Sequence, residues 1–265
     1  MFIAYGVAAL IYVAVCAHLY SALMREHPIH KKATIGALGV AMVLHGMLLY
    51  PQIITLYGLN FNIFNALSLT GLFFLAFFVL FSLYRPILSL GVLATPTALV
   101  SLSIGYFGQA AYEPIHNPSL GLSLHILLSF AAYCALLMSA VQAIILKLQI
   151  RELKHKTIHR FWVNKLPALQ SMESLLFDMI LTAFVLLSLA LGLGFVTTYD
   201  IFAQHVAHKT VFSLLSWFVL GWIIFAHYHY GWRGTRVANL TLYSFGLLAV
   251  GFIGSKAVLE LILGR

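Results

Sequence analysis

The sequence predicts an all-α fold, a polytopic integral membrane helix bundle of about eight transmembrane helices. Two observations predict it: a composition that is 62% hydrophobic and only 8% charged, and a series of long apolar runs. Soluble domains carry about a quarter of their residues as charged side chains, so this chain cannot cover a globule exposed to water. Helices suit lipid because they satisfy their own backbone hydrogen bonds.

Each apolar run is close to the ~20 residues that a transmembrane helix needs. Polar segments, most of which contain Gly, Pro or Asn, separate the runs. We expect helices at residues 2–23, 34–56, 63–84, 87–107, 120–146, 173–197, 208–230 and 237–262. The loops are too short for a soluble domain, so we predict a single membrane domain over residues 1–265. We expect the first run to be a span rather than a cleaved signal peptide, because no basic segment precedes it.

The basic residues predict the orientation. Alternation of eight spans places most of them on one side, and the positive-inside rule makes that side cytoplasmic. We therefore expect both termini to be periplasmic in a multi-pass protein of the bacterial inner (cytoplasmic) membrane. This pattern accounts for the net charge of +8 better than nucleic-acid binding does. The residues on the predicted cytoplasmic side are Arg25, Lys31, Lys32, Arg85, Lys147, Arg151, Lys154, Lys156, Arg160, Lys165, Arg233 and Arg236.

The sequence lacks the motifs of several kinds of functional site. Cys16 and Cys134 lie in separate apolar runs, without the C-x-x-C-H motif of covalent haem attachment. The sequence has no paired carboxylates, nucleophile–base constellation or phosphate-binding glycine loop. We expect a protein that is not an enzyme.

Histidines are the residues that predict a function. Ionisable groups inside a membrane span are costly and by default indicate function. His45 lies near the middle of the second run and needs a partner there. That partner is either a group on another helix, in a purely structural hydrogen bond, or a metal or haem iron.

The stretch from His208 to Arg236 presents two further histidines. His208 and His227 are nineteen positions apart, or ~28 Å along a helix, so the helix offers an imidazole toward each side of a membrane. His227 shares a face with Lys209, Ser213 and Ser216, a polar stripe that we expect to point into the bundle. His229 faces nearly the opposite way, between two tyrosines typical of the membrane interface.

His125 lies about one turn inside the outer end of the fifth run. Its face continues through small residues, among them Ser129, Ala132 and Ser139. Small residues permit close helix packing in membranes, and they also leave room for a flat macrocycle. The spacing leaves both interpretations open.

Four segments together carry a family resemblance: SLHILLSFAAYCALL, LPALQSMESLLFDMILTAFVLLSLALGLGF, HKTVFSLLSWFVLGWIIFAHYHYGWRG and GFIGSKAVLELI. They resemble the cytochrome c assembly family of membrane haem-handling proteins, and its bacterial inner-membrane branch in particular, over about residues 40–263. The resemblance implies non-covalent haem b held by histidines near both membrane faces. It also implies the lipid bilayer as surroundings, apocytochrome c or other cytochrome c maturation proteins as partners, and no nucleic acid.

Carried over to this chain, the resemblance assigns the outward-facing histidine to His125 and the inner-face histidine to His227, with His45 as its upstream partner. VAHKTVFSLLSW stands where the family has a tryptophan-rich loop, and the last outer histidine has no counterpart. By its depth, His208 is our candidate for the second outer ligand. The predicted haem iron ligands are thus His45 with His227 and His125 with His208. A haem-free accessory or regulatory membrane protein and a small-ion or small-molecule transporter are the alternatives.

Overall fold

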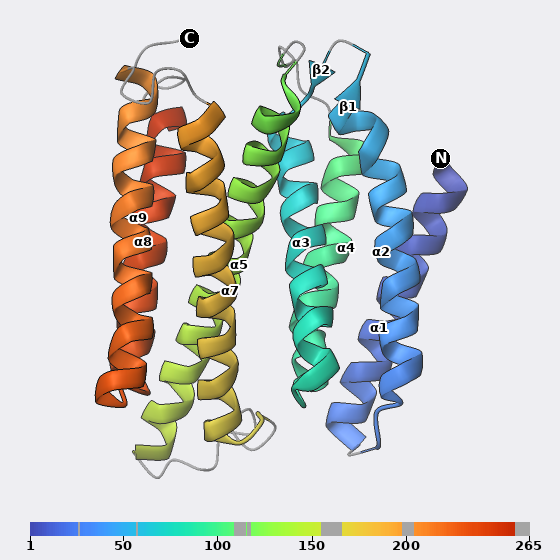
Figure 1. Ribbon diagram of the computed structural model, residues 1–265. Coiled ribbons are helices and arrows are strands. Elements are labelled where there is room, and N and C mark those ends of the chain that lie inside the picture. Colours follow the sequence, from blue (N-terminus) through green and yellow to red (C-terminus); the bar gives the residue numbers. More distant parts are fainter. Residues whose placement is uncertain are drawn as a thin grey trace. The chain divides into compact units, whose positions relative to one another are not determined.

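The structure is a computed structural model, and it describes residues 1–25, 27–56, 58–108, 115, 118–154, 166–197 and 204–257. Within 204–257, side chains are described for residues 209–251. The described residues form eight long helices, a short 3-10 helix η1 (Leu88–Leu90) and two short strands. The long helices are α1 (Phe2–Arg25), α2 (Lys31–Ile53), α3 (Ile63–Tyr84), α4 (Gly91–Phe107), α5 (Leu120–Lys154), α7 (Leu169–Thr197), α8 (Gln204–Tyr230) and α9 (Thr235–Ala257) (Figure 1).

Every predicted span corresponds to one of these helices. Among the described residues, seven helical segments are long and apolar enough to cross a membrane. The all-α, multi-pass membrane fold is therefore confirmed. The main differences are at helix ends: α5 continues to Lys154, beyond the predicted end at 146, because a helix leaving the bilayer tolerates the charged residues that follow.

The chain divides into two compact units. Unit 1 consists of residues 1–118 with 165–167, and unit 2 of residues 119–164 with 168–265. Unit 1 therefore contains α1 to α4, and unit 2 contains α5 to α9. The single membrane domain over residues 1–265 stays a prediction.

Small residues bring α3 and α4 together in unit 1. A side chain at Gly71 would collide with Ser101, and one at Gly105 would collide with Ser68. The two contacts are reciprocal, a glycine and a serine from each helix, so the backbones approach more closely than two large side chains would allow.

A β-hairpin that the sequence analysis did not predict follows α2. Strands β1 (Ile54–Thr55) and β2 (Gly58–Leu59) pair antiparallel, so the second helix ends at Ile53 instead of the predicted 56. Gly58 has φ 129°, a conformation that an L side chain rarely adopts. The Asn62 side chain then caps α3 by accepting a hydrogen bond from the Asn65 backbone N–H at 2.8 Å.

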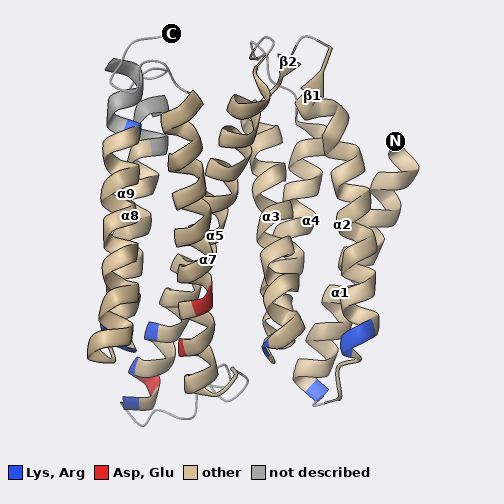
Figure 2. Cartoon of the chain, viewed as in Figure 1, with Lys and Arg blue, Asp and Glu red and all other residues tan. Residues whose placement is uncertain are grey.

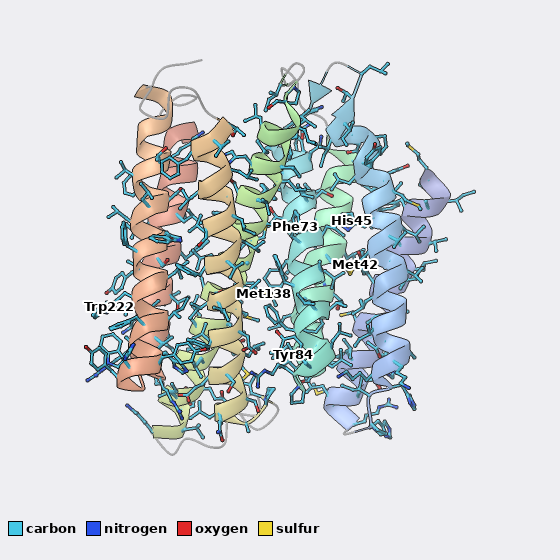
Figure 3. The ribbon with its side chains drawn as sticks, viewed as in Figure 1. Met42, His45, Phe73, Tyr84, Met138 and Trp222 are labelled. Atoms are coloured by element: carbon cyan, nitrogen blue, oxygen red, sulfur yellow. The ribbon has the colours of Figure 1, made fainter. Side chains whose placement is uncertain are left out.

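Unit 2 packs α5 against α7 and α8 against α9. The buried stripe of α8 contains Ser216, Leu220, Ile223 and Ala226. Of the polar stripe predicted to point inward, Ser216 is buried, Ser213 and His227 are half-buried, and Lys209 is exposed. The Ser216 hydroxyl lies 2.8 Å from that of Ser244 on α9. Trp222 lies to one side of this stripe and is about half exposed, as suits a lipid-facing residue (Figure 3).

Most of the described basic residues gather at one end of each unit, and Lys209, near the start of α8, lies at the other end of unit 2 (Figure 2). In unit 1 this is the end where α1 and α3 finish and α2 starts, with Arg25, Lys31, Lys32 and Arg85. In unit 2 it is the end where α5 and α8 finish and α7 and α9 start, with Lys147, Arg151, Lys154, Arg233 and Arg236. Each unit thus has the charge asymmetry that the positive-inside rule uses.

A buried polar network joins three helices of unit 1. His45 on α2 is fully buried (Figure 3). Its Nδ1 atom lies 3.3 Å from the Tyr12 hydroxyl on α1, and its Nε2 atom lies 2.9 Å from the Ser68 hydroxyl on α3. A neutral imidazole has one N–H donor and one acceptor nitrogen, and hydroxyls can take either role, so both ring nitrogens are satisfied.

Ser68→Ala should destabilise the protein by about 1–2 kcal/mol, because it leaves one nitrogen of the buried His45 ring unpaired. The remaining methyl group keeps the packing against Gly105. The measurement is the unfolding midpoint of the detergent-solubilised protein.

Ser82→Ala is the matched control. Ser82 is also buried on α3, but its hydroxyl donates to the Phe78 carbonyl of its own helix. Equal effects of the two substitutions would show that the interhelical hydrogen bond contributes nothing.

Candidate functional site

His125 lies in the second turn of α5, where its half-buried ring packs on α7. Its Nδ1 atom lies 2.8 Å from the backbone carbonyl oxygen of Ala190. Gly194, one turn further along α7, makes room for the ring: a Cβ there would lie 2.8 Å from His125 Cε1. The ring is therefore held by a hydrogen bond on one edge and by close contact with a backbone that carries no side chain.

His227 lies in the last turn of α8, and the turn that follows it supplies its partner. Its Nδ1 atom lies 2.9 Å from the Trp232 carbonyl oxygen. Gly231 and Gly234 both have positive φ, 64° and 66°, which glycine adopts without steric cost and which lets the chain reverse here. The His227 ring also stacks on Phe177 of α7, with centroids 3.9 Å apart.

These two hydrogen bonds assign the tautomer of each ring. A backbone carbonyl can only accept, so Nδ1 must carry the proton in both His125 and His227. In the neutral ring, Nε2 then keeps its lone pair. No described residue forms a hydrogen bond with either Nε2 atom. Histidines that bind metals have this arrangement, with one ring N–H donated to a carbonyl and the other nitrogen free to coordinate.

The two rings belong to different sites. They contact α7 at Ala190 and at Phe177, thirteen residues apart, which is ~20 Å along a helix. The axial ligands of one iron lie on its two faces, only a few ångströms apart. His125 and His227 are consequently candidates for two separate centres, one toward each end of unit 2.

His45 differs from both. Its two ring nitrogens are engaged by Tyr12 and Ser68, so coordination would require it to exchange one of these hydrogen bonds for the metal. The arrangement favours the structural alternative, an interhelical hydrogen bond. His45 belongs to unit 1 and His227 to unit 2, and their pairing stays a prediction.

The pairing of His125 with His208 also stays a prediction. His208 lies in α8, and its side chain is outside the described part of the structure. Among the described side chains, no group of three or more His, Cys, Asp or Glu residues could hold a metal ion. His229 is exposed and contacts Phe225, with ring centroids 4.3 Å apart, which fits the predicted position at the membrane interface.

Sequence reasoning missed three contributors to these sites: Gly194, Phe177 and the Trp232 carbonyl. The two glycines of GWRG could have indicated a tight turn after His227. No sequence pattern indicated the contacts that Gly194 and Phe177 of α7 make, because they depend on which helices pack side by side.

The comparisons with known proteins agree with this architecture. Residues 35–263 match the family described as Cytochrome C assembly protein. The chain is 31% identical over 165 residues to the inner membrane protein YpjD of Escherichia coli K12, an alignment that covers 62% of each chain. It is also 31% identical over 198 residues, 72% of each chain, to an uncharacterized 28.8 kDa protein of Azospirillum brasilense. No solved structure matches the chain.

The chain spans less than two thirds of the length of the YpjD relative. The family match, in contrast, covers residues 35–263, which is most of this chain. That match includes both His125 and His227 and falls on a multi-pass membrane fold. The chain belongs to the cytochrome c assembly protein family.

Proposed function

We propose that this protein binds b-type haem non-covalently in the bacterial inner membrane and takes part in cytochrome c biogenesis as a haem-handling protein, not as an enzyme. One observation carries the proposal: His125 and His227 each donate Nδ1–H to a backbone carbonyl and keep Nε2 available. The family match supports the class of function, and the name of the E. coli relative supports the membrane.

His125 and His227 would hold one haem each, toward opposite ends of unit 2. Bound haem would supply an iron that accepts or releases one electron. The protein's part is to orient the ligands. The Ala190 and Trp232 carbonyls hold the two imidazoles in the coordinating tautomer, Gly194 leaves space for the first ring, and Phe177 covers one face of the second.

Each centre needs a second axial ligand to be bis-histidine. We propose His208 beside His125 at the outer end. At the inner end, His45 remains the proposed partner of His227, provided that it gives up the Ser68 or Tyr12 hydroxyl. The basic ends of the helices would face the cytoplasm and both termini the periplasm, with apocytochrome c or another maturation protein as the receiver of haem.

The optical spectrum tests the proposal. Protein purified in detergent from haem-replete cells should show a Soret band. His125→Ala and His227→Ala should each lower the haem content by about half, because each removes a ligand from one of two separate centres. The measurement is Soret absorbance per protein after purification.

His229→Ala is the matched control, since it removes an exposed imidazole two residues from His227 and should leave the spectrum unchanged. A colourless, well-folded wild-type protein would contradict haem binding. It would instead favour a haem-free accessory protein.

The space under the His125 ring gives a second prediction. Gly194→Ala places a methyl group against the ring and should displace it from the Ala190 carbonyl. Loss of such a supporting contact typically weakens metal affinity by about 10- to 100-fold. The measurement is haem affinity by titration of the haem-free protein.

Gly192→Ala is the control on the same helix, because a Cβ at Gly192 would meet nothing within 4 Å. Equal haem affinities of the two variants would contradict the role assigned to Gly194.

A further inference from the structure

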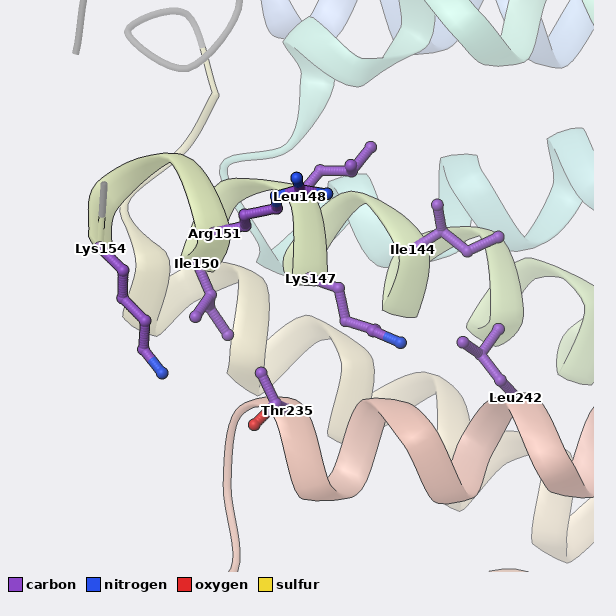
Figure 4. A pocket seen from close by; sticks show the side chains of 8 residues that line it. All are labelled: Ile144, Lys147, Leu148, Ile150, Arg151, Lys154, Thr235 and Leu242. Carbon is purple, nitrogen blue, oxygen red and sulfur yellow. The ribbon is translucent and has the colours of Figure 1, made fainter. Parts of the chain in front are cut away.

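A groove lies between α5 and α9 of unit 2, and neither His125 nor His227 lines it. Its volume is about 370 Å³, and Figure 4 shows its lining. Three of the eight lining side chains are cationic and the others are apolar except for one threonine. They are Ile144, Lys147, Leu148, Ile150, Arg151, Lys154, Thr235 and Leu242.

The three cations form one face of α5. Lys147, Arg151 and Lys154 lie within about 60° of one another around the helix. Lys147 is half-buried, and the other two are exposed. None of the three forms an ion pair with another described residue. Glu152, the described acid of this helix, is rotated by about 140° from Lys147, away from the cationic face.

Along α5 the lining begins with Ile144 and ends with the cations Arg151 and Lys154, and Lys147 and Leu148 are neighbours between them. Ile144 and Leu148 precede Lys154 on α5, so they lie deeper in the membrane span, and both are about half exposed. Leu242 lies seven residues into α9, or ~10 Å from Thr235 at its first residue. Figure 4 shows the Lys147 and Lys154 side chains reaching toward α9 on either side of Thr235.

The start of α9 adds to the positive potential. Its first backbone N–H groups have no partners within the helix, and helix N-termini favour anions. The Glu173 carboxylate lies close to the residue before this turn, with Oε1 3.3 Å from where a Cβ of Gly234 would stand, but Glu173 does not line the groove.

We infer that this groove binds an anionic phospholipid. The phosphate lies between Lys147, Lys154 and the first turn of α9, with Arg151 adding positive charge from the same stretch of α5, and an acyl chain lies over Ile144 and Leu242. A free phosphate would gain nothing from the apolar part, and a zwitterionic lipid would bring its own cation against the three of the protein. Grooves of this kind, basic and between helices on the cytoplasmic side, match anionic headgroups.

The test uses the protein in detergent, titrated with dioleoyl phosphatidylglycerol in mixed micelles and followed by native mass spectrometry and thermal unfolding. The wild type should bind the lipid and unfold at a higher temperature. Lys147→Gln/Arg151→Gln/Lys154→Gln should bind it on the order of 100-fold more weakly, from the sum of three surface cations. Lys147→Arg/Lys154→Arg should retain binding.

Arg25→Gln/Lys31→Gln/Lys32→Gln is the matched control, since it removes three cations from the basic end of unit 1 and should leave the bound lipid in place. Leu242→Trp keeps every charge and fills the apolar part, and it too should weaken binding. Equal binding of the two triple variants, equal binding of dioleoyl phosphatidylcholine, or equal stabilisation by inorganic phosphate would each overturn the inference.

Discussion

Every imidazole inside this protein must find its hydrogen-bond partner within the protein, because lipid offers none. An unpaired polar group in hydrocarbon costs several kcal/mol, more than close packing around one side chain returns. The three described histidines that are buried or half-buried in the helices meet this requirement in two ways. His45 uses both nitrogens in a network of side chains, whereas His125 and His227 use one nitrogen each, on a backbone carbonyl.

The two arrangements leave the imidazole with different abilities to bind a metal. A ring satisfied on both edges by hydroxyls joins helices and must give up a hydrogen bond before it can coordinate a metal. A ring bound only through Nδ1–H to a carbonyl is fixed in orientation and tautomer, and its Nε2 is a base without a described partner. The second arrangement occurs twice in unit 2, at positions ~20 Å apart along α7. The family match spans both residues.

Much of the fold could be predicted from the sequence, because the length and composition of an apolar run are local properties. The helices begin and end within a few residues of the predicted runs, apart from the extended α5. The hairpin after α2 could not be predicted in this way, since its pairing depends on Gly58 and on a bridge from Leu59 to Ile115. The need of His45 for a partner was predictable, but the identity of Tyr12 and Ser68 was not. Partners on other helices depend on neighbours and rotation, which one sequence does not specify.

The tautomers of His125 and His227 test the central claim most directly, and they can be measured without haem. Nitrogen-15 NMR of histidine-labelled protein in detergent micelles distinguishes the two tautomers of a neutral imidazole. His125→Gln and His227→Gln variants would assign the signals. The account predicts that both rings carry the proton on Nδ1 and leave Nε2 unprotonated. A proton on Nε2 of either ring at neutral pH, with Nδ1 bare, would contradict it.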